Sequence, residues 1–206
     1  MNNREFIDVL YKALNSPTQY ATGAFGAPTG VKNNTERYAS NSADWIAKKI
    51  RACPDGTFMF DCIGLAFKAP LWGWSADPTM RYGGAEYKKD GIPDVNLKNI
   101  EKYCDYWSTD ECRTESLIVP GEILRTPEKN HVGIYVGNGN VIEATSSGDC
   151  KVRMIPLHFR EWEGHGTIKY IDYMYDSYDP KKEYKKIGSI VCPHCGVPFE
   201  IYGEES

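Results

Sequence analysis

The chain has 206 residues, of which 41% are hydrophobic and 25% are charged, and its formal net charge at pH 7 is −4. These proportions are those of a packed globular domain, and the negative charge argues against a dedicated nucleic-acid binder, which needs a basic surface. No apolar run is long enough to cross a bilayer, and seven cysteines, an odd number in well-separated places, do not form the pattern of a disulfide framework.

The first half of the chain is predicted to consist of helices joined by long loops. Apolar residues at helical spacing predict an amphipathic helix over residues 4–15. Its charged residues and its lack of a small-residue cleavage site argue against a secretory signal peptide. We expect a loop over 16–40, which is rich in Gly, Pro, Thr and Asn, and a short helix over 43–52. A third helix is expected to begin after Asp61, a favourable N-cap residue, and to end at Pro70.

From residue 121 onward the apolar residues alternate with a period of two. This pattern predicts strands over 122–125, 131–136, 141–144, 151–155 and 167–173. Helices followed by such strands predict an α+β fold, with the N-terminal helices packed on a central antiparallel β-sheet. We expect one domain over residues 1–175, followed by a linker and a short tail over residues 176–206.

Cys62 is a candidate nucleophile because it would occupy the first turn of the third helix. Backbone N–H groups and the helix dipole stabilise a thiolate at such a position. The same N–H groups can stabilise the oxyanion that forms when a thiolate attacks a carbonyl group. The alternative is that Cys62 is a small buried hydrophobic residue, as many free cysteines are. The position of Cys62 alone does not decide between these interpretations.

His131 is the candidate base, and Glu143 on the next strand is the candidate residue that orients the imidazole ring. Of the four histidines, His131 alone begins an alternating strand, and it shares a face with Gly133, beside which a helix carrying a thiol could lie. A surface histidine and a solvated glutamate are the alternatives. A three-residue loop over 137–139 pairs Gly133 with Glu143 and brings Glu143 onto the face of His131. A two-residue loop places Glu143 on the opposite face, and we expect the three-residue loop.

Taken together, these segments resemble the NlpC/P60 cell-wall peptidases. The resemblance is carried in order by Phe60-Asp-Cys-Ile-Gly-Leu65, Gly121-Glu-Ile-Leu124, His131-Val-Gly-Ile-Tyr-Val-Gly137 and Val141-Ile-Glu-Ala144, and it spans Tyr20 to about Tyr173. It implies a papain-like fold and a catalytic set of Cys62, His131 and Glu143 that needs no cofactor. It also implies that Tyr20 contacts the nucleophile. The further candidates for the substrate-binding groove are Asp61, Trp72, Trp74 and Tyr82, and core packing is the expected role of at least one of the last three.

The resemblance implies a thiol mechanism acting on the stem peptides of bacterial peptidoglycan. His131 takes the proton of Cys62, or already shares an ion pair with it, while Glu143 fixes the ring. The family most often cleaves the bond between D-γ-glutamyl and the diamino acid, whereas some relatives are N-acetylmuramoyl-L-alanine amidases, and the sequence does not separate the two. A wall-binding module that has lost catalysis is a third interpretation, against which the intact Cys62 and His131 argue. A lipid acyltransferase is a more distant fourth.

The sequence departs from the family pattern in three places. Glu143 stands where the commonest third residue is His, Ile63 stands where Ser often follows the nucleophile, and the segment between Tyr20 and Cys62 is long. These features resemble the phage- and prophage-borne lysins of Gram-positive gut bacteria more than the housekeeping hydrolases. We therefore expect synthesis in the cytoplasm, release through a holin or another route that needs no signal peptide, and action at the bacterial cell wall.

The tail carries Cys192 and Cys195 in a Cys-Pro-His-Cys motif that resembles one half of a zinc knuckle. Two thiolates supply half of a tetrahedral zinc site. Because the chain has no second Cys-x-x-Cys motif, a tail with two thiols and no metal is the main alternative. A structural zinc site completed by another subunit, which would make the tail an oligomerisation element, or by residues beyond the C-terminus is the other. Metal analysis of the purified protein distinguishes these cases.

Overall fold

The computed structural model describes residues 1–110, 112, 114–174, 185–191 and 198–203. The chain forms two compact units, Met1–Met174 and Tyr175–Ser206. In the second unit, strand β10 (Lys185–Val191) pairs antiparallel with β11 (Pro198–Gly203). Cys192 and Cys195 lie outside the described residues, so zinc binding by the tail stays a prediction. The first unit contains the predicted catalytic residues.

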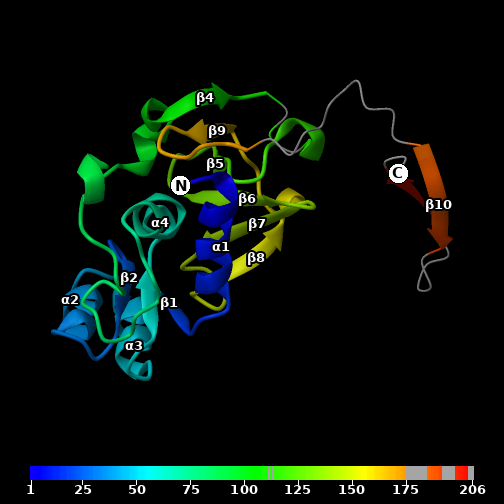
Figure 1. The fold of residues 1–206 in the computed structure, drawn as a ribbon. Coiled ribbons are helices and arrows are strands. Elements are labelled where there is room, and N and C mark those ends of the chain that lie inside the picture. Colours follow the sequence, from blue (N-terminus) through cyan, green and yellow to red (C-terminus); the bar gives the residue numbers. More distant parts are fainter. Residues whose placement is uncertain (111, 113, 175–184, 192–197, 204–206) are drawn as a thin grey trace. The chain divides into compact units, whose positions relative to one another are not determined.

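The first unit is built on a six-stranded antiparallel sheet with the strand order β4-β9-β5-β6-β7-β8 (Figure 1). Its strands are β4 (Cys104–Ser108), β5 (Ile123–Arg125), β6 (Val132–Gly137), β7 (Asn140–Ala144), β8 (Val152–Pro156) and β9 (Gly164–Ile168). The helices are α1 (Asn3–Leu14), α2 (Asn34–Ser40), α3 (Asp44–Ala52), the π-helix η1 (Gly64–Lys68) that continues into α4 (Ala69–Leu71), and the 3-10 helices η2 (Lys89–Gly91), η3 (Leu97–Tyr103), η4 (Glu115–Leu117) and η5 (Leu157–Phe159). The predicted α+β class is confirmed.

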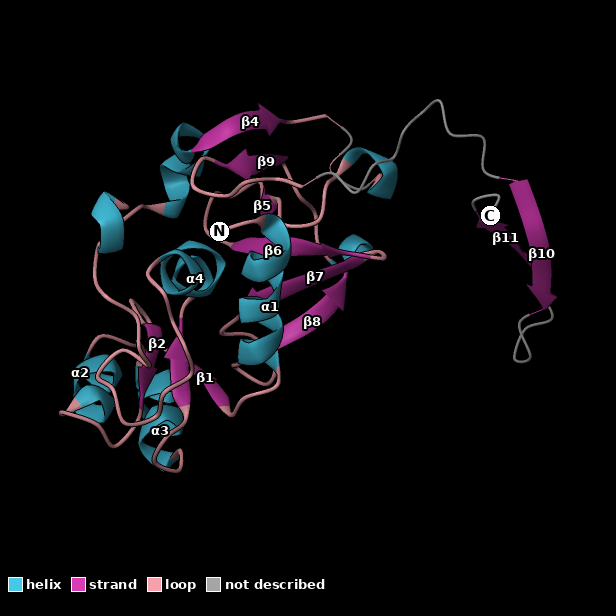
Figure 2. Ribbon diagram, viewed as in Figure 1, coloured by secondary structure: helices cyan, strands magenta, loops and turns pink. Residues whose placement is uncertain are grey.

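Helix α1 begins and packs as its sequence predicts. The Asn2 side chain accepts a hydrogen bond from the Glu5 N–H group, and the Glu5 carboxylate accepts one from the Asn2 N–H group, which is a capping box. The buried face of α1, with Phe6 and Leu10, shares a core with Ile134 of β6. Figure 2 shows α1 crossing β6, β7 and β8. Within the part of the chain that the structure describes, none of the helices has the length and apolar composition of a membrane span.

A second, three-stranded sheet lies in the region that we expected to be loop. Its strands β1 (Thr18–Tyr20), β3 (Phe58–Phe60) and β2 (Phe25–Pro28) have the order β1-β3-β2, and β1 runs parallel to β3. Strands of three or four residues are too short to show alternation, and all four residues of β2 are buried, so the region carries no period-two signal. The predicted loop over 16–40 is therefore wrong in part. Because β1 pairs with β3, Tyr20 lies opposite Phe60, two residues before Cys62.

The loop after β1 packs tightly on the helix that starts at Cys62. The carbonyl oxygen of Ala24 accepts a hydrogen bond from the Asp61 N–H group at 2.9 Å. The same oxygen would lie 1.9 Å from a Cβ atom placed on Gly64. Only glycine permits this approach, because the atom in the way belongs to the backbone. Gly64 therefore fixes the distance between the loop and the start of the helix.

Gly64→Ala is expected to lower the free energy of unfolding by about 2–4 kcal/mol, because the added methyl group must displace the backbone of the loop. Denaturant unfolding measures the loss. Gly91→Ala is the matched control, since an added Cβ there meets nothing within 4 Å and only its φ of +77° opposes the change. The control is expected to lose about 1 kcal/mol. Equal losses in the two variants would contradict the close approach.

Candidate active site

Cys62 is the first residue of its helix, and Asp61 caps that helix. The Asp61 carboxylate accepts one hydrogen bond from the Gly64 N–H group at 2.6 Å and another from the Gly23 N–H group at 2.8 Å. The N-cap role predicted for Asp61 is therefore confirmed. Because both carboxylate oxygens bind backbone N–H groups, Asp61 joins the loop after β1 to the helix start. Its role in substrate binding stays a prediction.

The Cys62 thiol is buried, with 4% of the residue exposed. Burial and, to a smaller extent, the charge of Asp61 raise the pKa of Cys62 to about 12, although the N–H groups of Val132, Ile63 and Cys62 itself act in the opposite direction. Desolvation thus outweighs the backbone N–H groups in this conformation and favours the thiol form of Cys62. The contribution of Val132 places the sulfur beside the first residue of β6, directly after His131.

His131 and Glu143 are brought together. The His131 Nε2 atom lies 2.7 Å from the Glu143 Oε2 atom. An ionised carboxylate only accepts hydrogen bonds, so Nε2 carries the proton and Nδ1 is the acceptor in a neutral ring. In the described part of the chain no hydrogen bond joins His131 to Cys62 in this conformation. The structure therefore contains the hydrogen bond between His131 and Glu143, and it places the Cys62 sulfur beside the backbone of Val132.

The predicted register is present, although it arises in an unexpected way. Ile134 lies opposite Ile142, which is the alignment that pairs position 133 with position 143. The turn itself has two residues, since Gly137 lies opposite Asn140. A β-bulge between Tyr135 and Gly137 supplies the shift of one residue that we had assigned to a three-residue loop. The predicted three-residue loop is therefore wrong. The predicted register, which brings Glu143 onto the face of His131, is nevertheless present.

The space beside Gly133 is not occupied by the thiol helix. A Cβ atom on Gly133 would lie 2.6 Å from the Val141 side chain and 3.3 Å from the Trp162 ring. Trp162 also stacks on His131, with 6.5 Å between the ring centroids and 23° between the ring planes. The indole nitrogen of Trp162 donates a hydrogen bond to the Leu157 carbonyl oxygen, which holds the indole in place. Gly133 therefore gives room to Trp162, which limits the motion of the His131 ring.

Glu143 is 1% exposed and has two arginine partners in addition to His131. Arg153 Nε donates to Oε1 at 2.9 Å, while Arg160 Nε donates to Oε2 at 2.6 Å and Arg160 Nη2 to Oε1 at 2.9 Å. Burial alone would raise the pKa of Glu143, but the hydrogen bonds from His131 and Arg160 outweigh it and lower the pKa to about 2. Glu143 is therefore ionised at neutral pH.

Tyr20 lies near the thiol, and the contact with the nucleophile that the resemblance implied stays a prediction. Burial and then the charges of Cys62 and Asp61 raise the pKa of Tyr20 far above its usual value, so these groups are close enough to interact electrostatically. The Tyr20 N–H group donates to the Cys150 carbonyl oxygen at 2.7 Å. This bond ties Tyr20 to the loop between β7 and β8. A contact between Tyr20 and substrate stays a prediction.

Trp72 and Trp74 do not line an open groove, which corrects the expectation for both residues. They are 0% and 3% exposed, and their indole nitrogens donate to the carbonyl oxygens of Ile92 and Gly26. Tyr82 is half-buried, and its hydroxyl group accepts a hydrogen bond from Arg37. The two tryptophans pack in the core against aromatic residues of the small sheet, and of the three candidates only Tyr82 keeps surface that a ligand could touch.

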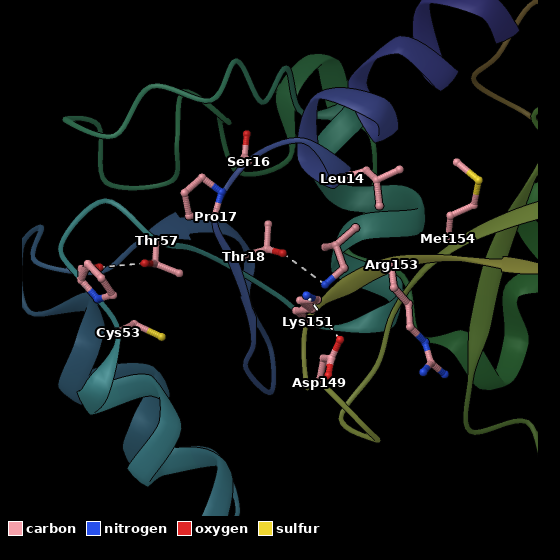
Figure 3. A pocket seen from close by; sticks show the side chains of 12 residues that line it. Leu14, Ser16, Pro17, Thr18, Cys53, Thr57, Asp149, Lys151, Arg153 and Met154 are labelled. Atoms are coloured by element: carbon pink, nitrogen blue, oxygen red, sulfur yellow. Dashed lines mark hydrogen bonds and ion pairs between the residues drawn. The ribbon is translucent and has the colours of Figure 1, made fainter.

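A cavity of about 620 Å³ lies between the end of α1, the turn after α3 and strand β8 (Figure 3). Its lining residues include Cys53, Lys151 and Arg153, but neither Cys62 nor His131. Among the residues that the structure describes, no group of three or more His, Cys, Asp or Glu side chains could hold a metal ion. The cavity thus borders the site at Arg153, which binds Glu143.

The sequence analysis missed three residues that contact the His–Glu pair. Arg153 lies directly opposite Glu143 in the pairing of β7 with β8. The strand predicted over 151–155 carried that signal, because opposite charges favour facing positions on paired strands. Arg160 and Trp162 come from the irregular segment between η5 and β9, where no periodic pattern exists to predict their direction.

No protein-family model and no curated protein matches the sequence. Among solved structures, the chain is similar to the P60 domain of an antigen from M. avium subspecies paratuberculosis, with a TM-score of 0.48 and 16% identity, covering 83% of this chain and 96% of that one. It is similar to the peptidoglycan hydrolase RipB from Mycobacterium tuberculosis, with a TM-score of 0.47 and 18% identity, covering 83% and 65%. NlpC1 from Trichomonas vaginalis has a TM-score of 0.42 and 18% identity, covering 81% and 43%. The chain thus spans less than two thirds of RipB and NlpC1.

The low pKa of Glu143 predicts a specific dependence of stability on pH. The folded-state value of about 2 lies below the ordinary value of 4.5. Ionised Glu143 therefore stabilises the fold fully above about pH 4.5, and this contribution is lost as the pH falls toward 2. Between these limits the wild type is expected to lose about 3 kcal/mol more of its unfolding free energy than Glu143→Gln does. Urea unfolding at several pH values measures the difference, and parallel pH curves for the two proteins would contradict it.

Proposed function

We propose that the chain is a cysteine hydrolase of the NlpC/P60 type that cleaves the stem peptides of bacterial peptidoglycan. The observation that carries the proposal is the His131–Glu143 pair at 2.7 Å beside the capped helix start that bears Cys62. An oriented imidazole next to a helix-start thiol is the arrangement that nucleophilic catalysis requires. The motif order in the sequence supports the same assignment.

In the proposed reaction, substrate binding brings the thiol of Cys62 against the Nδ1 atom of His131. Catalytic hydrogen bonds commonly tighten only in the substrate complex. His131 takes the thiol proton, and the thiolate attacks the peptide carbonyl carbon to form a C–S bond. The N–H groups of Cys62 and Ile63, which already favour the thiolate, stabilise the oxyanion. Glu143 stabilises the imidazolium ion.

Collapse of the tetrahedral intermediate breaks the C–N bond, and the imidazolium ion donates its proton to the leaving amine. A water molecule then gives one proton to His131 and attacks the thioester, which releases a carboxylic acid and restores the thiol on Cys62. The net reaction consumes one water and produces one amine and one acid. No cofactor takes part in these steps. We propose the bond between D-γ-glutamyl and the diamino acid as the one cleaved.

Cys62→Ala and His131→Ala are each expected to lower the rate of hydrolysis of purified cell walls by at least about 10³-fold, because each removes a group that forms or breaks a bond. Turbidity clearing and mass analysis of released fragments measure the loss. Cys53→Ala is the matched thiol control and is expected to keep activity, since Cys53 hydrogen-bonds to Gln19 and Lys49 away from the site. Normal clearing by Cys62→Ala would overturn the proposed mechanism.

The same mass analysis separates the endopeptidase from the amidase. New diamino-acid amino termini support the endopeptidase, and new L-alanine amino termini would replace it with the N-acetylmuramoyl-L-alanine amidase. The assignment to phage lysins and the holin-type release remain predictions. Digestion of defined stem peptides in place of whole walls makes the product assignment independent of wall chemistry.

A further inference from the structure

We propose that a cationic cavity beside helix α2 binds a free carboxylate of the wall peptide, away from the bond that is cleaved. The inference rests on the proposed function and adds a substrate contact outside the catalytic residues. The cavity has a volume of about 340 Å³, and its lining includes Lys32, Arg81 and Tyr82. Arg37 of α2 joins it by binding Tyr82. The name cationic cavity refers to these four residues.

Three positively charged side chains meet at the cationic cavity. Arg37 donates a hydrogen bond to the Tyr82 hydroxyl oxygen at 3.3 Å, and the Arg81 guanidinium group lies 5.1 Å from the centroid of the Tyr82 ring. Lys32 supplies the third charge. Among the residues that the structure describes, no ion pair joins any of these three side chains to a carboxylate. The cavity therefore offers positive charge to an anion from outside the chain.

The acidic residues of the neighbouring segments do not neutralise this charge. Glu36 accepts hydrogen bonds from the Nε and Nη2 atoms of Arg51, at 3.0 and 2.9 Å. Asp77 accepts hydrogen bonds from the N–H group and the hydroxyl group of Thr79, at 2.8 and 2.6 Å. Glu86 is not among the residues that line the cavity. The first two carboxylates thus bind other groups, and the third lies outside the lining.

Helix α2 places two buried polar atoms without a partner next to the cationic cavity. The Asn34 Oδ1 atom and the Tyr38 hydroxyl group have no hydrogen-bond partner in the part of the chain that the structure describes. Asn34 Nδ2 donates to the Arg81 carbonyl oxygen at 2.7 Å, and the Arg37 guanidinium group lies 5.5 Å from the centroid of the Tyr38 ring. Buried polar groups are nearly always paired with protein groups or ordered water. A polar ligand with its ordered waters can supply such partners, which supports a polar site here.

The small sheet connects the cationic cavity to the start of the helix that bears the thiol. The Tyr82 ring packs on Phe25 of β2, with 4.8 Å between the ring centroids. Phe25 lies opposite Phe60 of β3, the residue directly before Asp61. Burial raises the pKa of Tyr38 to about 12, and the charge of Asp61 adds a smaller increase, so α2 and the helix cap are close enough to interact. An extended peptide advances about 3.3 Å per residue, and a few residues therefore span such a distance.

A carboxylate is the anion that a stem peptide supplies. A γ-linked glutamyl residue and a C-terminal residue each keep a carboxyl group that no peptide bond uses. Guanidinium groups bind carboxylates through paired N–H donors, and Arg37 has further N–H donors besides the one that binds Tyr82. The cationic cavity therefore favours stem peptides with free carboxylates over peptides in which these groups are amidated.

The test measures the binding of two synthetic stem peptides to the Cys62→Ala protein by isothermal titration calorimetry. One peptide has free carboxylates outside the cleaved bond, and in the other these groups are amides. The free-carboxylate peptide is expected to bind about 10-fold more tightly, and Arg37→Gln and Arg81→Gln are each expected to lower this preference about 3-fold. Lys48→Gln is the control, because it removes a positive charge from an exposed position of α3 outside the cavity, and it is expected to keep the full preference.

Equal affinity for the two peptides would overturn the inference, and so would a preference that survives both arginine substitutions. Tighter binding of poly(glycerol phosphate) than of the free-carboxylate peptide, lost in the same variants, would assign the cavity to a phosphate and also overturn it. Binding is measured without hydrolysis, so the two proposals can fail separately. The expected preference in a protein whose wild type leaves cell walls intact would support the cavity and reject the hydrolase, whereas hydrolysis without the preference would do the opposite.

Discussion

The site depends on one buried negative charge. Glu143 is almost fully enclosed, and a carboxylate in such a place stays ionised only if cationic groups surround it. Its partners come from three separate segments, which are the start of β6, strand β8 and the segment after η5. The carboxylate therefore does two things at once. It joins the edge of the main sheet to the segment that covers it, and it fixes the orientation of the His131 ring.

The protonation state of the Cys62 thiol is set by burial, in contrast to that of Glu143. Burial keeps Cys62 protonated, whereas hydrogen bonds keep Glu143 ionised, although both groups lie in the same small volume. The difference arises from hydrogen bonding, because Glu143 receives strong charged donors and Cys62 receives only backbone N–H groups. A thiol of this kind reacts slowly with small oxidants and electrophiles. Burial thus protects the sulfur in this conformation.

The sequence predicted those parts of the site that local patterns control. Asp61 as a helix cap follows from residue type and position, and the face shared by His131 and Glu143 follows from period-two alternation. The bulge near Val136 could not be predicted, because it depends on how the hairpin twists against its neighbours. Arg160 could not be predicted either, since its segment has no period and its direction is set by packing.

In the fold as well, elements with a clear local sequence pattern were predicted and those without one were missed. The α+β class and most strands of the main sheet were predicted, whereas β4 was missed and β9 (Gly164–Ile168) lies earlier than the expected strand over 167–173. The sheet of β1, β2 and β3 was also missed, because its very short strands pair with partners 30 to 40 residues away in the sequence. The sequence alone could not decide whether Trp72 and Trp74 pack in the core or line a groove, since aromatic residues are common in both places. Their burial in the structure shows that both pack in the core.

The order of the segments along the chain has a consequence for synthesis. Ribosomes make Cys62 and His131 well before Arg153 and Arg160, so a nascent chain that ends near β7 holds a glutamate with neither guanidinium partner. Such a chain cannot bury Glu143 as an ion until β8 and the segment after η5 have been synthesised. The His–Glu–Arg cluster can therefore form only after both arginines have been synthesised.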